Sequence, residues 1–412
     1  MINNMPLNLD FVRNQFPSLS GGWIFMDNAG GSQVPTAVVK RVSEYLINSN
    51  VQLGASYEIS RIATGRVYEA PEMVAGLINA RESSEIIIGP STTLLIRILA
   101  LSISQTFKPG DEIIVTNCDH EANIGAWAEL EKKGMAIKKW LLNRDTFQLE
   151  LDDLKSLMSD KTRLVAVTHT SNILGTLNPI KEIAELVHSY GALICVDGVA
   201  HAPHRLIDVQ DLDADFYALS FYKVFGPHLA MLFGKKDLLL SMPGICHFFV
   251  EADNIPYKFQ PGSVNYELSY GLLGIGDYFN SVAEAHNISG GSFREKAGLV
   301  YNMIANHEEH LASALLAYLN SKPGIKIIGE TASGRNKRVP TISFIVENKM
   351  SDSVTRQVDA HKIGIRYGDF YARRLIDDLG LSKQNGVVRV SLVHYNTLEE
   401  VQKLINVFEQ VL

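Results

Sequence analysis

The chain has 412 residues, of which 46% are hydrophobic and 20% are charged, a balance typical of globular proteins. Its net charge of -7 at pH 7 and its lack of basic runs argue against a nucleic-acid surface. Residues 1–18 include Asp10 and Arg13 and lack the apolar core of a signal peptide, and no apolar run approaches the roughly 20 residues that span a bilayer. We therefore expect a cytoplasmic protein that binds neither nucleic acid nor membranes.

The first two-thirds of the chain alternates short apolar runs with amphipathic helical stretches. The predicted strands are Glu85–Gly89, Glu112–Thr116, Leu164–Thr168, Leu193–Val196, Phe216–Leu219 and Met231–Phe233. The predicted helices between them include Thr92–Ser104, Ala122–Lys133 and Ile180–Tyr190. This alternation predicts an α/β layer built on a mainly parallel sheet.

The last third has a different order of elements. A long helix is predicted from Gly274 to Leu319, with an interruption near Asn287–Gly291. Strands at Lys326–Ile328, Thr341–Val346 and Val387–Leu392 follow, and a final helix begins at Leu398. Mixed order of this kind favours a smaller α+β domain.

The segment 89–100, GPSTTLLIRILA, predicts the end of a strand followed by an apolar helix. Ser91, Thr92 and Thr93 open that helix, where hydroxyls ordinarily act as caps. The free N–H groups of a helix N-terminus also bind phosphate dianions. The spacing alone leaves both roles open.

His120 and Asn172 each follow a predicted strand, in TNCDHEAN and THTSNILGTLNP. An imidazole at the end of a strand could stack on a flat cofactor and transfer protons, and the amide could bind a ring oxygen. Capping and turn roles explain the same positions equally well.

Asp197 ends the apolar strand in ALICVDGVAHAPH. Ligands of open α/β sheets lie beyond the carboxyl ends of the strands. A carboxylate there can pair with a pyridinium nitrogen and keep the ring electron-accepting. Taken alone, a cap or turn aspartate is the simpler interpretation.

Lys223 is the only Lys, Arg, Asp or Glu in the window 216–234, FYALSFYKVFGPHLAMLFG. An unpaired buried ammonium is costly, and burial favours the neutral amine. A neutral amine is what a Schiff-base lysine requires. The alternative is a lysine whose ammonium reaches the surface from a loop.

With these motifs in this order, the chain resembles the class V, fold-type I enzymes that use pyridoxal 5′-phosphate (PLP). It is most similar to the cysteine desulfurase and selenocysteine lyase branch. The segments that carry the resemblance are FMDNAGGSQVP, GDEIIVTNCDHEANI, VTHTSNILGTLNPI, VDGVAHAPHRLIDVQDLDADFYALSFYKVFGP and VRVSLVHYNTLEEV. It implies a large domain (20–275) with a mainly parallel seven-stranded sheet, and a smaller α+β domain (276–412, with 1–19).

The resemblance also implies a role for each residue near the cofactor. Lys223 would carry PLP as a Schiff base, Asp197 would pair with the pyridine nitrogen, and His120 would stack on the ring. These three would be the catalytic residues, and Asn172 would meet the ring hydroxyl oxygen. The phosphate would be held by Thr92, Thr93, Ser220 and Tyr222, the last at a position where the family usually has histidine.

Further residues follow from the same resemblance. Ser263, in GSVN, would reach the phosphate of a partner subunit, which implies a homodimer with shared active sites. Arg389 would grip the substrate α-carboxylate with its bidentate fork. Asn28, Ala29 and Tyr371 would line the same pocket.

The departures from the family pattern concern sulfur transfer. A desulfurase needs a mobile cysteine to accept sulfur, yet residues 361–380 contain none, and Tyr371 stands near the expected position. The three cysteines of the chain lie far apart, at Cys118, Cys195 and Cys246, without the spacing of a disulfide or metal site. Ala200 and His201 replace a ring-contacting glutamine, and Gln52 and Leu53 replace a basic pair.

We therefore expect a C–S β-lyase that acts on cysteine or a cysteine conjugate. The alternative is an aminotransferase or epimerase in which Tyr371 or His201 serves as a second acid. A PLP-binding protein without catalysis is a third interpretation.

Overall fold

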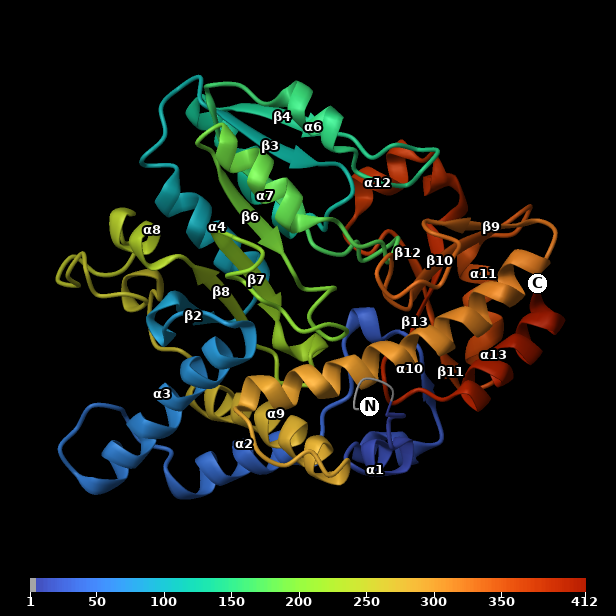
Figure 1. Cartoon of the computed structure of the whole chain (residues 1–412), viewed down its shortest axis with the longest axis horizontal. Helices are drawn as coiled ribbons and strands as arrows, with labels where there is room; N and C mark the ends of the chain where they lie inside the picture. The colour runs from blue at the N-terminus through green and yellow to red at the C-terminus, as the bar shows by residue number, and fades with distance from the viewer. Residues whose placement is uncertain (1–4) are drawn as a thin grey trace.

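The computed structural model describes residues 5–412. Its centre is a seven-stranded sheet in the order β2-β8-β7-β6-β5-β3-β4 (Figure 1). The strands are β2 (Ile86–Gly89), β3 (Glu112–Thr116), β4 (Ala136–Trp140), β5 (Thr162–Thr168), β6 (Leu193–Asp197), β7 (Phe216–Ser220) and β8 (Ala230–Gly234). All neighbours are parallel except β8, which runs antiparallel to both β2 and β7. The predicted mainly parallel sheet is confirmed.

The sheet is covered on both faces because its strands send alternate side chains to opposite sides. In β5, Val165 and Val167 join one hydrophobic core while Leu164 and Ala166 join the other. Helices α4 (Thr92–Ile103) and α5 (Ala122–Ala128) pack in the second core, and α3 (Glu58–Ile78) and α7 (Ile180–Ser189) pack in the first. The remaining helices of this part of the chain are α2 (Thr36–Asn48), α6 (Leu151–Leu157), α8 (Lys236–Ser241) and α9 (Tyr266–Ala285).

Strand β4 was missed by the sequence pattern. It lies at the sheet edge beside β3 and carries Lys138 and Lys139, with full burial only at Trp140. An edge strand with one solvated side does not produce a continuous apolar run.

A second sheet, in the order β12-β13-β10-β9, is antiparallel throughout. Its strands are β9 (Ile325–Ile328), β10 (Thr341–Val346), β12 (Arg366–Gly368) and β13 (Val387–Ser391). The long predicted helix is interrupted as expected, and α9 is followed by α10 (Phe293–Ser321), which Figure 1 shows as a rod reaching this sheet. The domain boundary at residue 275 stays a prediction.

A separate two-stranded sheet joins the N-terminal part of the chain to its C-terminal part. Strand β1 (Ile24–Phe25) pairs in parallel with β11 (Ile363–Gly364). The remaining helices are α1 (Leu9–Asn14), α11 (Ser351–Asp359), α12 (Arg373–Asp378) and α13 (Leu398–Val411). This pairing brings residues 27–29 next to the C-terminal end of β13.

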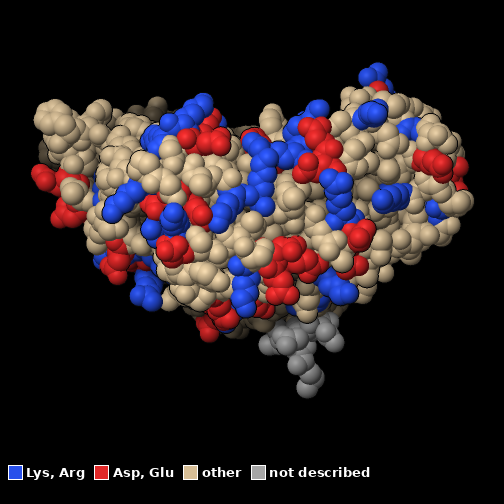
Figure 2. All heavy atoms as spheres, turned by 90° about the horizontal axis from the view of Figure 1, so that it is seen from above, with Lys and Arg blue, Asp and Glu red and all other residues tan. Residues whose placement is uncertain are grey.

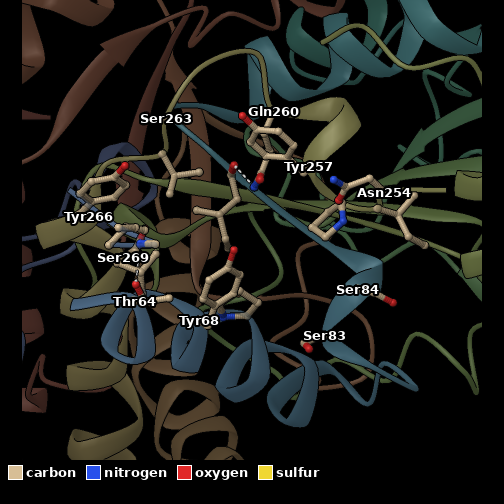
Figure 3. Close-up of a pocket in the computed structure, with 18 of the residues that line it drawn as sticks. Thr64, Tyr68, Ser83, Ser84, Asn254, Tyr257, Gln260, Ser263, Tyr266 and Ser269 are labelled. Atoms are coloured by element: carbon tan, nitrogen blue, oxygen red, sulfur yellow. Dashed lines mark hydrogen bonds between the residues drawn. The ribbon is translucent and has the colours of Figure 1, made fainter. Parts of the chain in front are cut away.

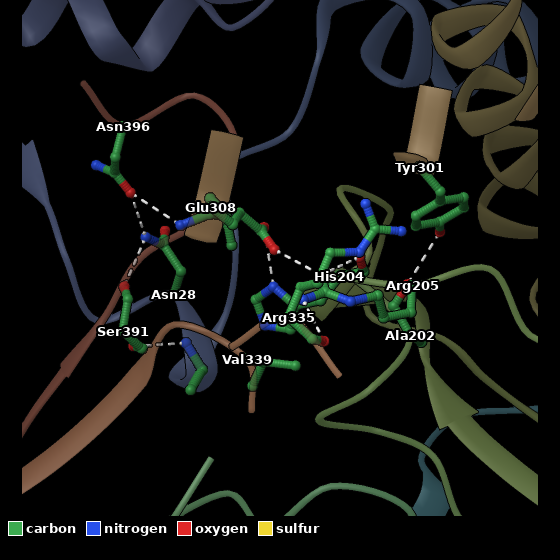
Figure 4. Close-up of polar contacts among 12 residues, drawn as sticks. Asn28, Ala202, His204, Arg205, Tyr301, Glu308, Arg335, Val339, Ser391 and Asn396 are labelled. Atoms are coloured by element: carbon green, nitrogen blue, oxygen red, sulfur yellow. Dashed lines mark hydrogen bonds and ion pairs between the residues drawn. The ribbon is translucent and has the colours of Figure 1, made fainter. Parts of the chain in front are cut away.

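A buried polar network fixes the loop that follows β6 (Figure 4). Glu308 of α10 is fully buried, and its Oε1 lies 2.9 Å from His204 Nδ1 while its Oε2 accepts from Arg205 at 3.2 Å. Tyr301 donates to the Ala202 carbonyl at 2.9 Å. Because this loop begins at Asp197, α10 helps to hold the end of β6 in place.

The surface carries mixed charge. On the face in Figure 2, basic and acidic side chains are interspersed, without a large area of one sign. No helix within residues 5–412 combines the length and apolarity needed to cross a membrane.

Candidate active site

A cavity lies where the central strands end, and eight of the predicted residues line it. It collects side chains that follow β2, β3, β5, β6 and β7, which are far apart in the sequence but share one edge of the sheet. These residues are Thr92, Thr93, His120, Asn172, Asp197, Ser220, Tyr222 and Lys223.

Lys223 lies in the turn after β7 and is only 7% exposed. Within residues 5–412 its amine makes no hydrogen bond or ion pair. Burial and the nearby Arg389 lower the Lys223 pKa from 10.5 to about 8, against the opposing charges of Asp197 and Asp27. The lowered pKa leaves a sizeable fraction of this buried amine neutral near physiological pH, far more than for an ordinary lysine.

Asp197 ends β6 and is buried. Its carboxylate accepts one hydrogen bond, from the Val199 N–H at 2.9 Å, and burial raises its pKa. The backbone is fixed by the His169 N–H, which donates to the Asp197 carbonyl at 2.8 Å. Next to it, a Cβ on Gly198 would come within 2.0 Å of the Tyr217 ring, so only glycine fits there. A buried carboxylate with so few donors is suited to a cationic partner.

His120 follows β3 and has a neutral ring. Burial and the charge of Lys223 lower its pKa to about 4. Its Nδ1 accepts from the Ala122 N–H at 3.1 Å, and its ring lies 5.2 Å from the Tyr371 ring. The ring can therefore stack on a flat ligand without adding a positive charge.

The N-terminus of helix α4 forms another part of the cavity wall. Ser91 accepts from the Leu94 N–H at 3.2 Å, so the predicted cap is confirmed. Thr92 Oγ1 lies 2.7 Å from Ser220 Oγ, which joins the hydroxyls that follow β2 and β7. Hydroxyls beside free helix N–H groups are suited to a phosphate.

Asn172 presents an unused acceptor. Its Nδ2 donates to the Phe370 carbonyl at 2.9 Å, while its Oδ1 is buried without a hydrogen-bond partner. A buried orphan acceptor in a cavity is explained when a ligand supplies the donor. A ring hydroxyl would do so, and with Asp197, Lys223 and the α4 N-terminus, the residues present fit PLP.

Arg389 lies on β13 and is 2% exposed. Its Nη2 donates to Asp27 Oδ1 at 2.9 Å and its Nη1 to the Asn172 carbonyl at 3.1 Å, while its Nε has no partner. Arg389 also lowers the Lys223 pKa, so the two cations act on one another. Several of its five N–H donors stay available for a carboxylate.

Asn28 and Ala29 contact the end of β13. The Asn28 amide donates to the Ser391 carbonyl at 2.9 Å and its Oδ1 accepts from the Tyr395 hydroxyl, and the Ala29 N–H donates to Ser391 Oγ at 2.8 Å. The polar groups of Asn28 are thus used within the protein. A direct substrate contact by either residue stays a prediction.

Tyr371 belongs to a short loop that lies over the His120 side of the cavity. Its side chain is 70% exposed, and its carbonyl accepts from the Glu121 N–H at 2.7 Å. Arg374 binds the Glu121 carboxylate through two hydrogen bonds of 2.9 Å.

The backbone of Phe370 and Tyr371 in this loop is left-handed, with φ of 51° and 61°. Such angles are uncommon for bulky residues and often mark functional sites.

Ser263 lies outside this cavity within one chain. It lines a second cavity of about 530 Å³, together with Tyr257, Gln260 and Tyr266 (Figure 3). Gln52 and Leu53 line the same second cavity. The predicted action of Ser263 on a partner subunit stays a prediction.

Ala200 and His201 differ in their position relative to the cavity. Ala200 lines the Lys223 cavity, while His201 packs behind it, with its ring stacked 3.5 Å from the His169 ring. The His201 Nδ1 lies 3.0 Å from Thr170 Oγ1, and burial lowers the His201 pKa well below its usual value.

No cysteine lines the Lys223 cavity among residues 5–412. Cys118 and Cys195 are buried, and burial raises the pKa of both thiols. Cys246 is half-buried beside the Gln260 carbonyl at 3.7 Å. Within the same residues, no group of His, Cys, Asp and Glu could hold a metal ion.

Sequence reasoning missed Asp27 and Phe370. Asp27 stands in the motif FMDNAGG, so its position before Asn28 was a usable signal. No pattern in the sequence indicated Phe370, because its contact with Arg389 forms only when the loop packs against β13.

The fold and this cavity define an α/β enzyme of fold type I that binds PLP. The family model described as Aminotransferase class-V matches residues 24–290 and 292–404. The chain belongs to the class V aminotransferase family and is a PLP-dependent enzyme.

Individual relatives agree with this assignment. The chain is 45% identical over 420 residues to the aminotransferase-like protein FGM3 of Gibberella zeae, covering 100% of both chains. It is 34% identical over 416 residues to the cysteine desulfurase-like protein ustD of Aspergillus flavus, covering 98% of this chain and 91% of that protein. The solved apo structure of a cysteine desulfurase from Thermococcus onnurineus NA1 superposes with a TM-score of 0.85 at 27% identity, covering 99% of this chain and 98% of the other.

We expect the rate at which PLP attaches to the cofactor-free protein to rise with pH and to level off above about pH 8. The Lys223 pKa of about 8 means that half of the amine is neutral at that pH and nearly all of it about one pH unit higher. Rapid mixing with PLP, followed at ~420 nm, measures the rate. A free lysine derivative is the control, because its rate should still rise toward pH 10. A protein rate that followed this control would contradict the lowered pKa.

Proposed function

We propose that this enzyme is a C–S β-lyase that acts on cysteine or a cysteine conjugate. The single observation that carries the proposal is a complete set of PLP-binding groups in a cavity that no thiol lines within residues 5–412. Sulfur that leaves the substrate would therefore depart as sulfide or thiol instead of passing to an enzyme thiolate. The relatives named as cysteine desulfurase or desulfurase-like support an amino-acid substrate of this kind.

Each residue has a task in this reaction. Arg389 binds the α-carboxylate, and the neutral Lys223 amine takes the proton from the α-carbon. When bound, the PLP ring accepts the electrons released there, and Asp197 keeps its nitrogen protonated. Loss of the α-proton to Lys223 would be followed by cleavage of the bond between the β-carbon and sulfur, and the sulfur would leave with the bonding electrons. The net reaction with water gives a thiol or sulfide, pyruvate and ammonium.

His120 and the α4 N-terminus position the reacting groups. The neutral His120 ring would pack against the cofactor face, and Thr92, Thr93, Ser220 and Tyr222 would hold its phosphate. Because a ring against one face and hydroxyls at the phosphate restrain different parts of a flat ligand, its tilting and rotation would be restricted. We further propose a homodimer in which Ser263 completes the phosphate site of the partner.

Transamination is the second candidate. The identity of 45% to a protein named aminotransferase-like favours it. In that case Lys223 would return the proton to the cofactor and no bond to the β-carbon would break.

Product analysis distinguishes the candidates. Purified enzyme is incubated with L-cysteine, S-benzyl-L-cysteine or L-alanine, without any thiol reductant. A β-lyase releases pyruvate, ammonium and sulfide or thiol in equal amounts from the sulfur substrates only. A keto acid together with pyridoxamine phosphate would instead identify an aminotransferase, and a D-amino acid would identify an epimerase.

Alkylation gives a matched control for the sulfur route. Cys246 is the half-buried thiol, whereas Cys118 and Cys195 are buried and have raised pKa values. Iodoacetamide should therefore modify Cys246 and leave sulfide release unchanged. Loss of release after alkylation would show that sulfur passes through a thiol and would overturn the proposed route.

A further inference from the structure

The face of the Phe370 ring contacts the guanidinium of Arg389. The Cζ of Arg389 is 3.6 Å from the centroid of the Phe370 ring. At this separation the ring face attracts the cation, and the attraction is stronger where water is excluded, as it is around the buried Arg389.

The other contacts of Arg389 leave a gap that the ring fills. Asp27 and the Asn172 carbonyl each accept one N–H of the guanidinium, and the Nε has no partner. Two hydrogen bonds restrain the edges of a planar group but resist tilting of its plane only weakly. The Phe370 ring, packed against one face of the guanidinium, resists this tilting. We call this ring the Phe370 platform; it fixes the direction of the N–H groups that have no partner.

The backbone of Phe370 is held in place at some cost. Its φ of 51° is left-handed, which is unfavourable for a residue with a bulky side chain. The Asn172 amide donates to its carbonyl at 2.9 Å, and the next residue, Tyr371, is bonded to Glu121. Asn172 thereby contacts both Phe370 and Arg389, so the platform and the cation share one support.

We propose that Phe370 is a positioning residue for substrate recognition, which orients Arg389 for the α-carboxylate. This inference rests on the proposed role of Arg389. It also assigns a cause to the strained loop: the left-handed turn brings the ring beneath the guanidinium. The second arginine near the ring, Arg366, is 5.9 Å away and 58% exposed on its side chain, so water weakens its contact.

The test compares two ligands that differ only in the carboxylate. L-alanine and L-alaninamide are titrated into the PLP-loaded enzyme, and binding is read from the absorbance of the bound cofactor. Neither ligand has a leaving group on its β-carbon, so the result does not depend on whether the enzyme is a lyase. Phe370→Leu should weaken L-alanine binding by about 3- to 30-fold and leave L-alaninamide binding unchanged within twofold.

Phe370→Tyr is the matched variant. It keeps the aromatic face and meets the same left-handed backbone, so L-alanine should bind within twofold of the parent enzyme. Equal weakening of both ligands by Phe370→Leu would assign Phe370 a general packing role and overturn the proposal. Unchanged binding of both ligands would overturn it as well. Failure of the proposed lyase reaction would appear only in product analysis.

Discussion

Replacing Lys223 with alanine is expected to abolish turnover and the covalent attachment of PLP. The variant loses both the amine that tethers the cofactor and the base that takes the α-proton. General-base catalysis alone contributes about 10²- to 10⁴-fold, so we expect a loss of at least about 10⁴-fold in kcat. The measurement is product formation over many turnovers, together with the absorbance of the purified protein near ~420 nm.

Borohydride labelling locates the attachment directly. Reduction of the native enzyme followed by peptide mass analysis should place the cofactor on Lys223 alone. Lys236→Ala is the control, since this lysine pairs with Glu82 at the surface and is not among the residues that line the cavity. A Lys223→Ala enzyme that still completes many turnovers, or a label on another lysine, would contradict the assignment of the catalytic amine.

Replacing Arg389 with alanine is expected to lower kcat/KM by about 30- to 1000-fold, mainly through KM. The substrate carboxylate would lose a charge-assisted bidentate contact worth about 2–4 kcal/mol. Asp27 would also lose its 2.9 Å ion pair and keep the longer one to Arg366, at 3.8 Å. Steady-state kinetics with a substrate that bears an α-carboxylate measures the change.

Two further variants sharpen this result. Arg389→Lys should recover only a small part of the loss, because an ammonium cannot form the planar fork. Arg373→Ala should have little effect, since Arg373 is exposed at the start of α12 and pairs with Asp369 and Asp377. Kinetics unchanged in Arg389→Ala would mean that the carboxylate is bound elsewhere.

The sequence predicted best those residues whose role depends on their immediate neighbours in the chain. Lys223 stood out because a charged residue in an apolar window demands an explanation, and the structure shows that its amine is buried in the cavity. Asp197, His120 and Asn172 stood out because each ends or follows a strand, and parallel strands place such positions at one edge. These four positions and the sheet type followed from periodicity, strand order and the resemblance.

Contacts between distant segments were decided by the tertiary structure. Local composition predicts neither the pairing of β1 with β11 nor the ion pair between Asp27 and Arg389. The same holds for the left-handed turn that brings Phe370 against Arg389, since phenylalanine does not favour that conformation and only its surroundings hold it there. Local sequence thus determined the strands and the candidate reactive groups, because burial and strand periodicity act over a few residues. The shape of the substrate site came from packing between segments that are hundreds of residues apart.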